Sequence, residues 1–281
     1  QTINYFNKNF INKNNQLLGS AYDADSDGVE GKYYTYNYDE IRNINEIDKY
    51  FEIKEKGNWE GKIILKELKA APEQIITKLK KIRLKKNKPF FDSKTQLDLN
   101  SLWISSLISA DTVIPNQGYL NQAEELYDQL DKYFSENNLF HSNSKSVVFI
   151  EDYAFYISSL IDLHEKTLNL KYKIKAIKIT KRAIEKFYIM DKAIFQKNEL
   201  DTNDLFFRPI DIGDHTIPNG NSVMLMNLTR LGFKNEAKEL ANSLNGYLNI
   251  YKTFMISSVK SIDYLNQIES NKKCNHEGCS V

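Results

Sequence analysis

Amphipathic helix patterns recur along the chain and restrict it to folds built mainly from packed helices. Apolar residues return at intervals of three and four residues, which is the period of a helix that buries one face. The segments with this pattern are 3–11, 71–86, 100–110, 119–135, 152–166, 172–188, 222–231 and 235–247. Alternating stretches between them, such as 18–22, 32–38 and 194–196, are too short for a large sheet. The sequence therefore predicts a mainly α protein with small β-hairpins in its loops.

A short motif repeats at the ends of three of these helices. An aromatic pair is followed by a polar turn and then by an apolar pair. The copies are Tyr5-Phe6 with Leu17-Leu18, Tyr133-Phe134 with Leu139-Phe140, and Phe187-Tyr188 with Ile194-Phe195. Helical hairpins that each bury a face against the next build solenoids or closed toroids, and the loops at one end form the functional surface. The aromatic pairs themselves are expected to be core residues.

The charge balance excludes several classes of partner. The 281 residues carry a formal net charge of +1, so bulk charge does not recruit nucleic acid or an anionic membrane. The longest apolar runs, 147–150 and 223–226, are far below the ~18 residues of a membrane helix. No signal-peptide pattern opens the chain, and we expect a soluble, cytoplasmic protein. The chain begins with Gln1 in a helical pattern, which suggests a missing N-terminal part.

An acidic loop lies near the start of the chain, in residues 21–34. Asp23, Asp25 and Asp27 alternate before a glycine, and this spacing also opens a calcium-binding loop. The twelfth position of such a loop needs a bidentate Glu but holds Tyr34, so we expect no high-affinity calcium site. A solvated hairpin turn, or a carboxylate cluster at the mouth of a functional cavity, are the other interpretations.

Several separated motifs together resemble one protein family. They read DADSDGVEGKYY, PFFDSK with LDLNSL, EDYAF with LIDLHE, and DHTIPNGNS with LTRLG, in this order over most of residues 3–233. The chain resembles the proteins, including the spermatogenesis-associated protein 20 type, in which an N-terminal thioredoxin-like domain precedes an α/α barrel. The resemblance implies an (α/α)6 toroid similar to the six-hairpin glycosidases and to the N-acylglucosamine 2-epimerase fold. It also implies a thioredoxin-like domain that is missing from this chain.

Catalysis on a sugar needs two carboxylates with separated pKa values, one protonated as the acid and one ionised as the base or nucleophile. The candidates in the motif loops are Asp25, Asp98, Asp152 and Asp214. His215 could act as a general base near neutral pH, although a locally hydrogen-bonded loop histidine is the simpler interpretation. His141 and His164 give weaker signals still.

Other polar residues in the motif loops are candidates for substrate binding. They are Glu30, Asn100, Glu151, Tyr153, Arg208 and Asn221. Structural roles compete with this interpretation, because side-chain oxygens at helix starts cap free N–H groups and contribute about 1 kcal/mol. Carboxylates such as Glu151 and Asp152 also favour the positive end of a helix. Both roles can coexist.

The C-terminal segment holds the chain's two cysteines, Cys274 and Cys279, with His276 between them. These residues supply at most three zinc ligands, so a closed structural site is incomplete, and we expect no metal. A reduced tail, a disulfide and a redox role remain open. The sequence analysis assigns residues 1–248 to a partial α/α barrel and 249–281 to a C-terminal extension.

Two hypotheses for function follow. In the first, the loop carboxylates bind or process a polyhydroxylated, carbohydrate-like small molecule by epimerase-, isomerase- or glycoside-hydrolase-like chemistry, without a cofactor. In the second, the domain is a non-catalytic scaffold for the thioredoxin-like domain. An enzyme should place two carboxylates within about 5 to 10 Å of each other across one cavity. A scaffold should use them to cap separate helices.

Overall fold

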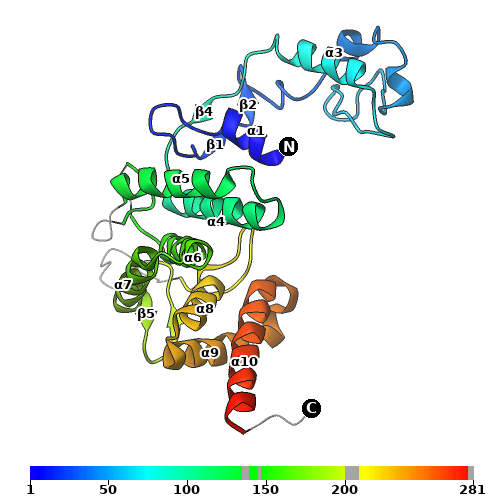
Figure 1. Ribbon diagram of the computed structural model, residues 1–281. Helices are drawn as coiled ribbons and strands as arrows, with labels where there is room; N and C mark the ends of the chain where they lie inside the picture. Colours follow the sequence, from blue (N-terminus) through cyan, green and yellow to red (C-terminus); the bar gives the residue numbers. More distant parts are fainter. Residues whose placement is uncertain (135–138, 145–146, 200–208, 278–281) are drawn as a thin grey trace. The chain divides into compact units, whose positions relative to one another are not determined.

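The computed structural model describes residues 1–134, 139–144, 147–199 and 209–277, and helices dominate them (Figure 1). The α-helices are α1 (Thr2–Asn9), α2 (Tyr38–Ile41), α3 (Glu73–Arg83), α4 (Leu97–Val113), α5 (Tyr119–Tyr133), α6 (Ile150–Thr167), α7 (Leu170–Phe187), α8 (Gly220–Leu231), α9 (Lys234–Tyr251) and α10 (Ile256–Glu277). Two 3-10 helices are η1 (Ile47–Lys49) and η2 (Lys252–Met255). The strands are β1 (Ala21–Tyr22), β2 (Asp25–Ser26), β3 (Val29–Glu30), β4 (Phe91–Asp92), β5 (Tyr188–Ile189) and β6 (Ile194–Phe195). The prediction of a mainly α fold with short β-hairpins is confirmed.

The chain divides into two compact units. One consists of Gln1–Leu18 together with Lys94–Val281, and the other of Gly19–Ser93. The smaller unit contains the antiparallel pairs β1–β4 and β2–β3, together with α2, η1 and α3. It has a small apolar core of its own, which includes Ile41, Ile63 and Leu79. The sequence analysis placed a single boundary after residue 248, whereas the structure divides the chain at other positions and keeps α10 with the helical unit.

The larger unit is built from helical hairpins. Helices α4 and α5, α6 and α7, and α8 and α9 pair in succession, and α10 packs against α8 and α9 (Figure 1). The first helices of the pairs are neighbours, because α4 packs on α6 and α6 packs on α8. Helix α6 is buried along most of its length as a result. This order places the starts of α4, α6 and α8 next to one another.

Helix α7 shows how the sequence specifies an outer helix. Its buried residues are Tyr172, Ala176, Ile179, Thr180, Ala183 and Phe187, at steps of mostly three and four along the helix. Lysines fill much of the opposite face, where the charged ends reach water. The aromatic pair at its end packs inward, since Phe187 contacts Tyr153 edge to face with ring centroids 5.1 Å apart. These contacts confirm that the helix periodicity marks the buried face.

Two buried asparagines hold equivalent copies of the repeated loop. In α4, Asn100 accepts a hydrogen bond from the N–H of Leu18 (2.8 Å) and donates one to the carbonyl of the same residue (3.2 Å). In α8, Asn221 accepts from the N–H of Phe195 and donates to its carbonyl, both at 2.9 Å. Each asparagine side chain thus makes the same two hydrogen bonds, one accepted and one donated, that a neighbouring β-strand would make with the extended loop residue. Asn100 and Asn221, which the sequence analysis proposed as substrate-binding residues, have these structural contacts instead of facing a cavity.

Helix α10 was not predicted from the sequence. Its first turns bury Ser258 and Ser261 against the helical core, and Ser261 donates to the carbonyl of Ser222 in α8 (2.8 Å). Small polar residues on the buried face interrupt the apolar periodicity that reveals other helices. Within the described ranges, no helix is both long and apolar enough to cross a membrane.

We predict that Asn221→Ala destabilises the helical unit by about 3 kcal/mol, because the change leaves buried backbone groups without partners. Asn221 is fully buried and also donates to the carbonyl of Asp211 (2.9 Å). Denaturant unfolding monitored by circular dichroism measures the effect. Asn242→Ala, on the exposed face of α9, is the matched control and should leave the free energy of unfolding nearly unchanged. Equal stability of the two variants would contradict a structural role for Asn221.

Candidate functional site

The starts of α4, α6 and α8 border a cavity of about 370 Å³ in the helical unit. The loops that precede these helices complete its wall. The polar residues of the wall include Asp98, His141, Glu151, Lys197, Asp211 and Asn219. Helix starts carry a partial positive charge, which favours carboxylates in the first turn. The cavity therefore combines acidic side chains with backbone that stabilises them.

Gly220 allows two of these helix starts to approach closely. A Cβ atom at this position would lie 2.8 Å from Cγ2 of Ile150 and 3.4 Å from the backbone nitrogen of Glu151. A larger residue would therefore push the first turn of α8 away from the first turn of α6. The glycine keeps Glu151 beside the α8 loop.

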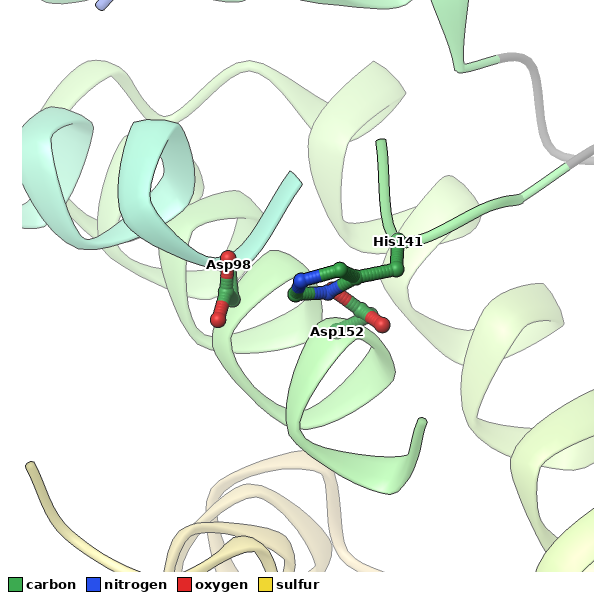
Figure 2. A group of neighbouring side chains, drawn as sticks. All are labelled: Asp98, His141 and Asp152. Atoms are coloured by element: carbon green, nitrogen blue, oxygen red, sulfur yellow. The ribbon is translucent and has the colours of Figure 1, made fainter. Parts of the chain in front are cut away.

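Three residues that are distant in sequence form the centre of the site. Asp98 comes from the first turn of α4, His141 from the loop before α6, and Asp152 from the first turn of α6 (Figure 2). One potential ligand atom from each lies within 4.8 Å of those of the other two. Two of the predicted carboxylates thus lie together, and a histidine that the sequence analysis ranked low lies between them.

Backbone contacts fix the loop that carries His141. Its carbonyl accepts from the N–H of Leu97 (3.0 Å), and its own N–H donates to the carbonyl of Val147 (3.0 Å). The imidazole lies edge to face against Phe149, with ring centroids 5.2 Å apart. Both the position and the plane of the ring are therefore defined by its neighbours.

The imidazole of His141 has a polar neighbour at each nitrogen. Nδ1 lies 3.0 Å from Oδ1 of Asp152, and Nε2 lies 2.7 Å from the amide nitrogen of Gln96. With the amide of Gln96 donating to Nε2, the proton of the neutral ring stands on Nδ1 and is donated to Asp152. The hydrogen bond with Asp152 raises the pKa of His141 above its ordinary value, and burial opposes this only in part.

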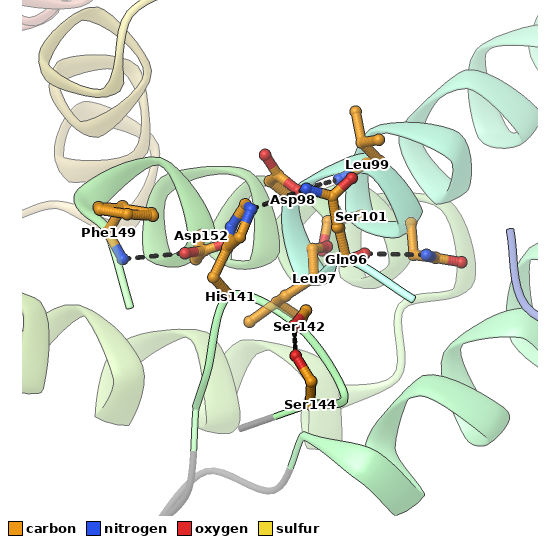
Figure 3. Close-up of polar contacts among 11 residues, drawn as sticks. Gln96, Leu97, Asp98, Leu99, Ser101, His141, Ser142, Ser144, Phe149 and Asp152 are labelled. Atoms are coloured by element: carbon orange, nitrogen blue, oxygen red, sulfur yellow. Dashed lines mark hydrogen bonds and ion pairs between the residues drawn. The ribbon is translucent and has the colours of Figure 1, made fainter. Parts of the chain in front are cut away.

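Asp152 is fully buried and holds its hydrogen-bond partner His141 in place. Its second oxygen, Oδ2, accepts from the N–H of Phe149 at the start of α6 (2.9 Å; Figure 3). One carboxylate therefore caps the helix and orients the imidazole at the same time. This arrangement is the acid–histidine pairing in which the carboxylate fixes the tautomer of the base.

Asp98 differs from Asp152 in its environment. Burial is the main cause that raises its pKa to about 6, and the nearby charge of Asp152 adds to the increase. The proximity of His141 and the N–H of Leu99, which lies 2.7 Å from Oδ1, oppose it. A carboxyl group with this pKa exchanges its proton near neutral pH. The site therefore holds two neighbouring groups, the carboxyl group of Asp98 and the imidazole of His141, that can exchange protons near neutral pH.

A second charged group lies on another part of the wall. Burial raises the pKa of Glu151, and among the described residues no donor reaches its buried oxygen Oε2. Lys197 lies 3.6 Å from Oδ2 of Asp211, measured from Nζ, and keeps 38% of its side chain exposed. The ammonium group of Lys197 therefore makes only a long contact with Asp211, and it forms no direct ion pair with Glu151.

Asp98, His141 and Asp152 are also residue types that bind metal ions. A ligand histidine needs one ring nitrogen free for the metal. Here Nδ1 faces Asp152 and Nε2 faces Gln96 at hydrogen-bonding distance. Both ring nitrogens are therefore engaged by protein groups in this arrangement.

Two other predicted catalytic residues lie in the loop before α8. Asp214 accepts from the N–H and the side-chain amide of Asn219 (3.1 and 2.9 Å), and from the N–H of Ser257 at the start of α10 (2.8 Å). Its carboxylate is therefore engaged in holding the loop. His215 lines the cavity, but 76% of its side chain is exposed, and its Nε2 lies 3.7 Å from Asp211. It is placed at the rim, away from the buried centre.

Several further predicted residues lie in the core of the helical unit, in the smaller unit or outside the described residues. Tyr153 is buried against Phe187 in the core. Asp25 and Glu30 pair across the β2–β3 hairpin of the smaller unit, and both are exposed. Arg208 and Cys279 lie outside the described residues, and Cys274 belongs to α10 at a position where the side chain is not described.

The acidic hairpin itself is organised by ordinary polar contacts. Asp27 pairs with Lys32 (2.8 Å) and accepts from the side-chain amide of Asn87 (2.9 Å), and the Lys32 contact is the main cause that lowers its pKa. These contacts explain the carboxylate without a cation. The absence of a calcium site stays a prediction.

Two basic residues of the cavity wall, which the sequence analysis missed or ranked low, make matching backbone contacts. The carbonyl of His141 accepts from the N–H of Leu97, the first residue of α4, and the carbonyl of Lys197 accepts from the N–H of Ile150, the first residue of α6. The repeated motif does not predict both positions, because His141 directly follows the pair Leu139-Phe140, whereas Lys197 lies two residues after the pair Ile194-Phe195. The similarity of the two residues is therefore visible only in the structure.

The comparisons with known proteins identify the fold. No family model matches the chain. It is 26% identical over 219 residues to the uncharacterized protein B0495.5 of Caenorhabditis elegans, a match that covers 72% of this chain and 30% of that protein. The chain thus spans less than a third of the length of this relative.

Among solved structures, a GH76 alpha-mannanase of Bacteroides thetaiotaomicron matches with a TM-score of 0.51 and 13% identity, over 67% of this chain and 57% of that one. A cellobiose 2-epimerase of Bacillus thermoamylovorans matches with a TM-score of 0.45 and 12% identity, over 64% and 61% of the two chains. The alpha-mannanase match agrees with the observed succession of hairpins, and the chain has the fold of α/α toroids.

We predict that Asp98→Asn stabilises the protein at pH 8, by on the order of 2 kcal/mol, because it removes a buried charge. The pKa of Asp98 is raised to about 6 on folding. Its contribution to stability is therefore present below pH ~4 and is lost as the pH rises through about 6. The variant's advantage should disappear below pH ~4, near the unfolded pKa.

Denaturant unfolding of both proteins between pH 4 and 8 measures this effect. Asp128→Asn on the exposed face of α5 is the control, and it should leave the pH profile unchanged. Because Asp98 and His141 shift each other's pKa, the difference between the profiles reports Asp98 together with its coupling to His141. A variant that is less stable than the parent at pH 8 would show that the ionised carboxylate is held by favourable contacts.

Proposed function

We propose that the cavity binds a polyhydroxylated, carbohydrate-like molecule and that Asp98, His141 and Asp152 carry out proton transfer on it. The observation that carries this proposal is the meeting of the three residues, with ligand atoms within 4.8 Å of one another, behind one cavity whose wall includes Asp98 and His141. A volume of about 370 Å³ falls in the range of small-molecule sites, which is ~300–1,000 Å³. The carboxyl, amide and imidazole groups of the wall offer hydrogen bonds to a ligand that carries many hydroxyl groups.

Each of the three residues has a distinct role in this proposal. Asp98, with its pKa of about 6, donates a proton in its neutral form. His141 accepts a proton at Nε2 once the amide of Gln96 gives way to the substrate, and Asp152 stabilises the imidazolium that results. A general acid and a general base on either side of a substrate atom are the requirement for moving a hydrogen.

The geometry favours epimerase- or isomerase-like chemistry over hydrolysis of a glycosidic bond. A glycosidase needs two carboxyl groups that both reach the glycosidic bond. Here Asp152 is fully buried between a backbone N–H and His141. A carboxylate in that position is poorly placed to attack a sugar. Removing and returning a proton needs only Asp98 and His141 to reach the substrate.

The non-catalytic scaffold remains the second candidate, and a specific observation favours it. Asp152, Asp214 and Asn219 each cap or fasten a helix start, as loop-structuring residues would. In this alternative the chain is the α/α-barrel part of a longer thioredoxin-domain-containing protein, in line with its match to 30% of a longer relative. Capping accounts for these three residues, and the first-turn positions of Asp98 and Glu151 also suit helix starts, but burial raises the pKa of both carboxyl groups.

We predict that the protein exchanges the hydrogen next to the carbonyl carbon of an aldose with solvent deuterium. His141→Asn should lower the exchange rate by at least about 100-fold, because the general base is lost while a donor toward Asp152 is retained. Asp98→Asn should lower it as well. Proton NMR of aldohexoses and their disaccharides in deuterated water measures the exchange.

Asp128→Asn, on the exposed face of α5, should exchange as fast as the parent. If ligand-observed NMR detects neither binding nor exchange for any saccharide of a broad panel, the scaffold is the better description. Exchange that persists in His141→Asn would assign the base to another residue.

A further inference from the structure

The side-chain amide of Gln96 lies against the imidazole nitrogen of His141 that faces away from Asp152. Nε2 of Gln96 and Nε2 of His141 are 2.7 Å apart (Figure 3). Gln96 is half-buried and immediately precedes α4. In the proposed function, Nε2 of the ring is the atom with which His141 accepts a proton. Gln96 therefore contacts the reactive nitrogen of the base.

Backbone contacts hold Gln96 and His141 next to each other. Gln96 forms an antiparallel bridge with Ser142, the residue after His141. The N–H of Leu97 donates to the carbonyl of His141 (3.0 Å). The carbonyl of Gln96 accepts from the side-chain amide of the buried Asn100 (2.8 Å). Because both backbones are fixed in this way, the orientation of the amide depends only on the side-chain torsions of Gln96.

The two charge states of the ring need opposite ends of this amide. In the neutral ring, Nδ1 donates its proton to Asp152, so that Nε2 is an acceptor and faces the NH₂ group of Gln96. In the imidazolium, Nε2 carries a proton and needs an acceptor, which the carbonyl oxygen Oε1 of the amide provides. A half-turn about the last torsion of a glutamine exchanges these two ends, and that torsion is broad and roughly two-fold. The amide can therefore pair with the base before and after it accepts a proton.

The carboxylates near the ring favour the imidazolium. The hydrogen bond with Asp152 is the main cause that raises the pKa of His141, and the charges of Asp98 and Glu151 raise it further, while burial lowers it. A donor on Nε2 stabilises the neutral ring instead, because it pairs with the lone pair that protonation would use. The amide of Gln96 thus opposes the carboxylates. The other titratable groups that line the cavity are those of Lys197, Asp211 and His215.

We propose that Gln96 is a positioning residue for the base: its amide favours the neutral imidazole of His141 by donating to Nε2, and it turns by half a turn when the ring is protonated. A substrate that reaches Nε2 displaces the amide, so the base is uncovered only while a ligand is bound. The role of His141 as a base rests on the proposed function, whereas the contact between amide and ring does not.

Nitrogen-15 NMR of the histidine rings in the full chain tests the orientation of the amide. Above the pH at which His141 titrates, Nδ1 should carry the proton, and Nε2 should have the downfield shift of an unprotonated ring nitrogen. As the pH is lowered, the side-chain amide signal of Gln96 should shift with the same midpoint as the ring, because the amide turns over. His141→Asn assigns the ring signals and should abolish this shift. A neutral ring with its proton on Nε2 would overturn the proposal.

Gln96→Glu tests the control of the base. It places an acceptor of the same shape beside Nε2, so it should raise the pKa of His141 by about one pH unit through a charge-assisted hydrogen bond. Below both pKa values, the neutral fraction of the ring, and with it the rate of hydrogen exchange on a sugar, should fall about tenfold. The ratio of the variant's rate to the parent's should return toward one at higher pH, which a loss of folded protein would not allow. Gln117→Glu, in the exposed turn before α5, is the matched control and should leave the pKa and the rate unchanged.

The outcomes separate the role of Gln96 from the proposed function. The NMR measurements need no substrate, and the shift of the Gln96 amide in the parent protein remains a test if Gln96→Glu does not fold. If no saccharide exchanges hydrogen while the NMR results are as expected, the proposed function fails and the control of the imidazole by Gln96 stands. If the pKa of His141 is the same in Gln96→Glu as in the parent, Gln96 does not control the base and the inference is wrong.

Discussion

The candidate site depends on a single buried anion, the carboxylate of Asp152. Burying a carboxylate is costly unless hydrogen bonds and opposite charge compensate it. The start of α6, the N–H of Phe149 and the imidazole of His141 provide this compensation. His141 in turn holds the start of α4 through its carbonyl and Leu97. The same contacts that stabilise one charge therefore join two hairpins and orient a base.

The sequence predicted the helices because their apolar periodicity is strong, and it predicted the repeat because the loops reuse one motif. It located Asp98 and Asp152 but not the histidine between them, since a lone histidine in a loop has no periodicity to mark it. It also proposed Asn100 and Asn221 as binding residues, whereas both hold extended loop residues. Contacts between residues so far apart in sequence arise from tertiary packing, which cannot be recognised from local sequence patterns.

Helix α10 is a second feature that the pattern of apolar residues in the sequence does not reveal. A helix that buries serines, such as Ser258 and Ser261, against its neighbours lacks the apolar stripe on which pattern recognition relies. The division of the chain has a similar cause, because the unit of Gly19–Ser93 interrupts the helical unit in sequence. Residues 1–18 and 94–281 come together only through contacts such as the stacking of Phe6 on Trp103, with ring centroids 4.9 Å apart.

The choice between a scaffold and a ligand site depends on the acidic groups that do not stabilise the fold. Asp152 caps a helix, and Asp214 holds a loop, so packing alone would retain both. Asp98 and Glu151 are different, because burial raises the pKa of each and their ionised forms weaken the fold near neutral pH. A neutral amide of the same shape would fit either position at lower cost in free energy. Acidic groups that the fold alone does not require, placed together in a cavity, are the pattern expected of a site that acts on a ligand.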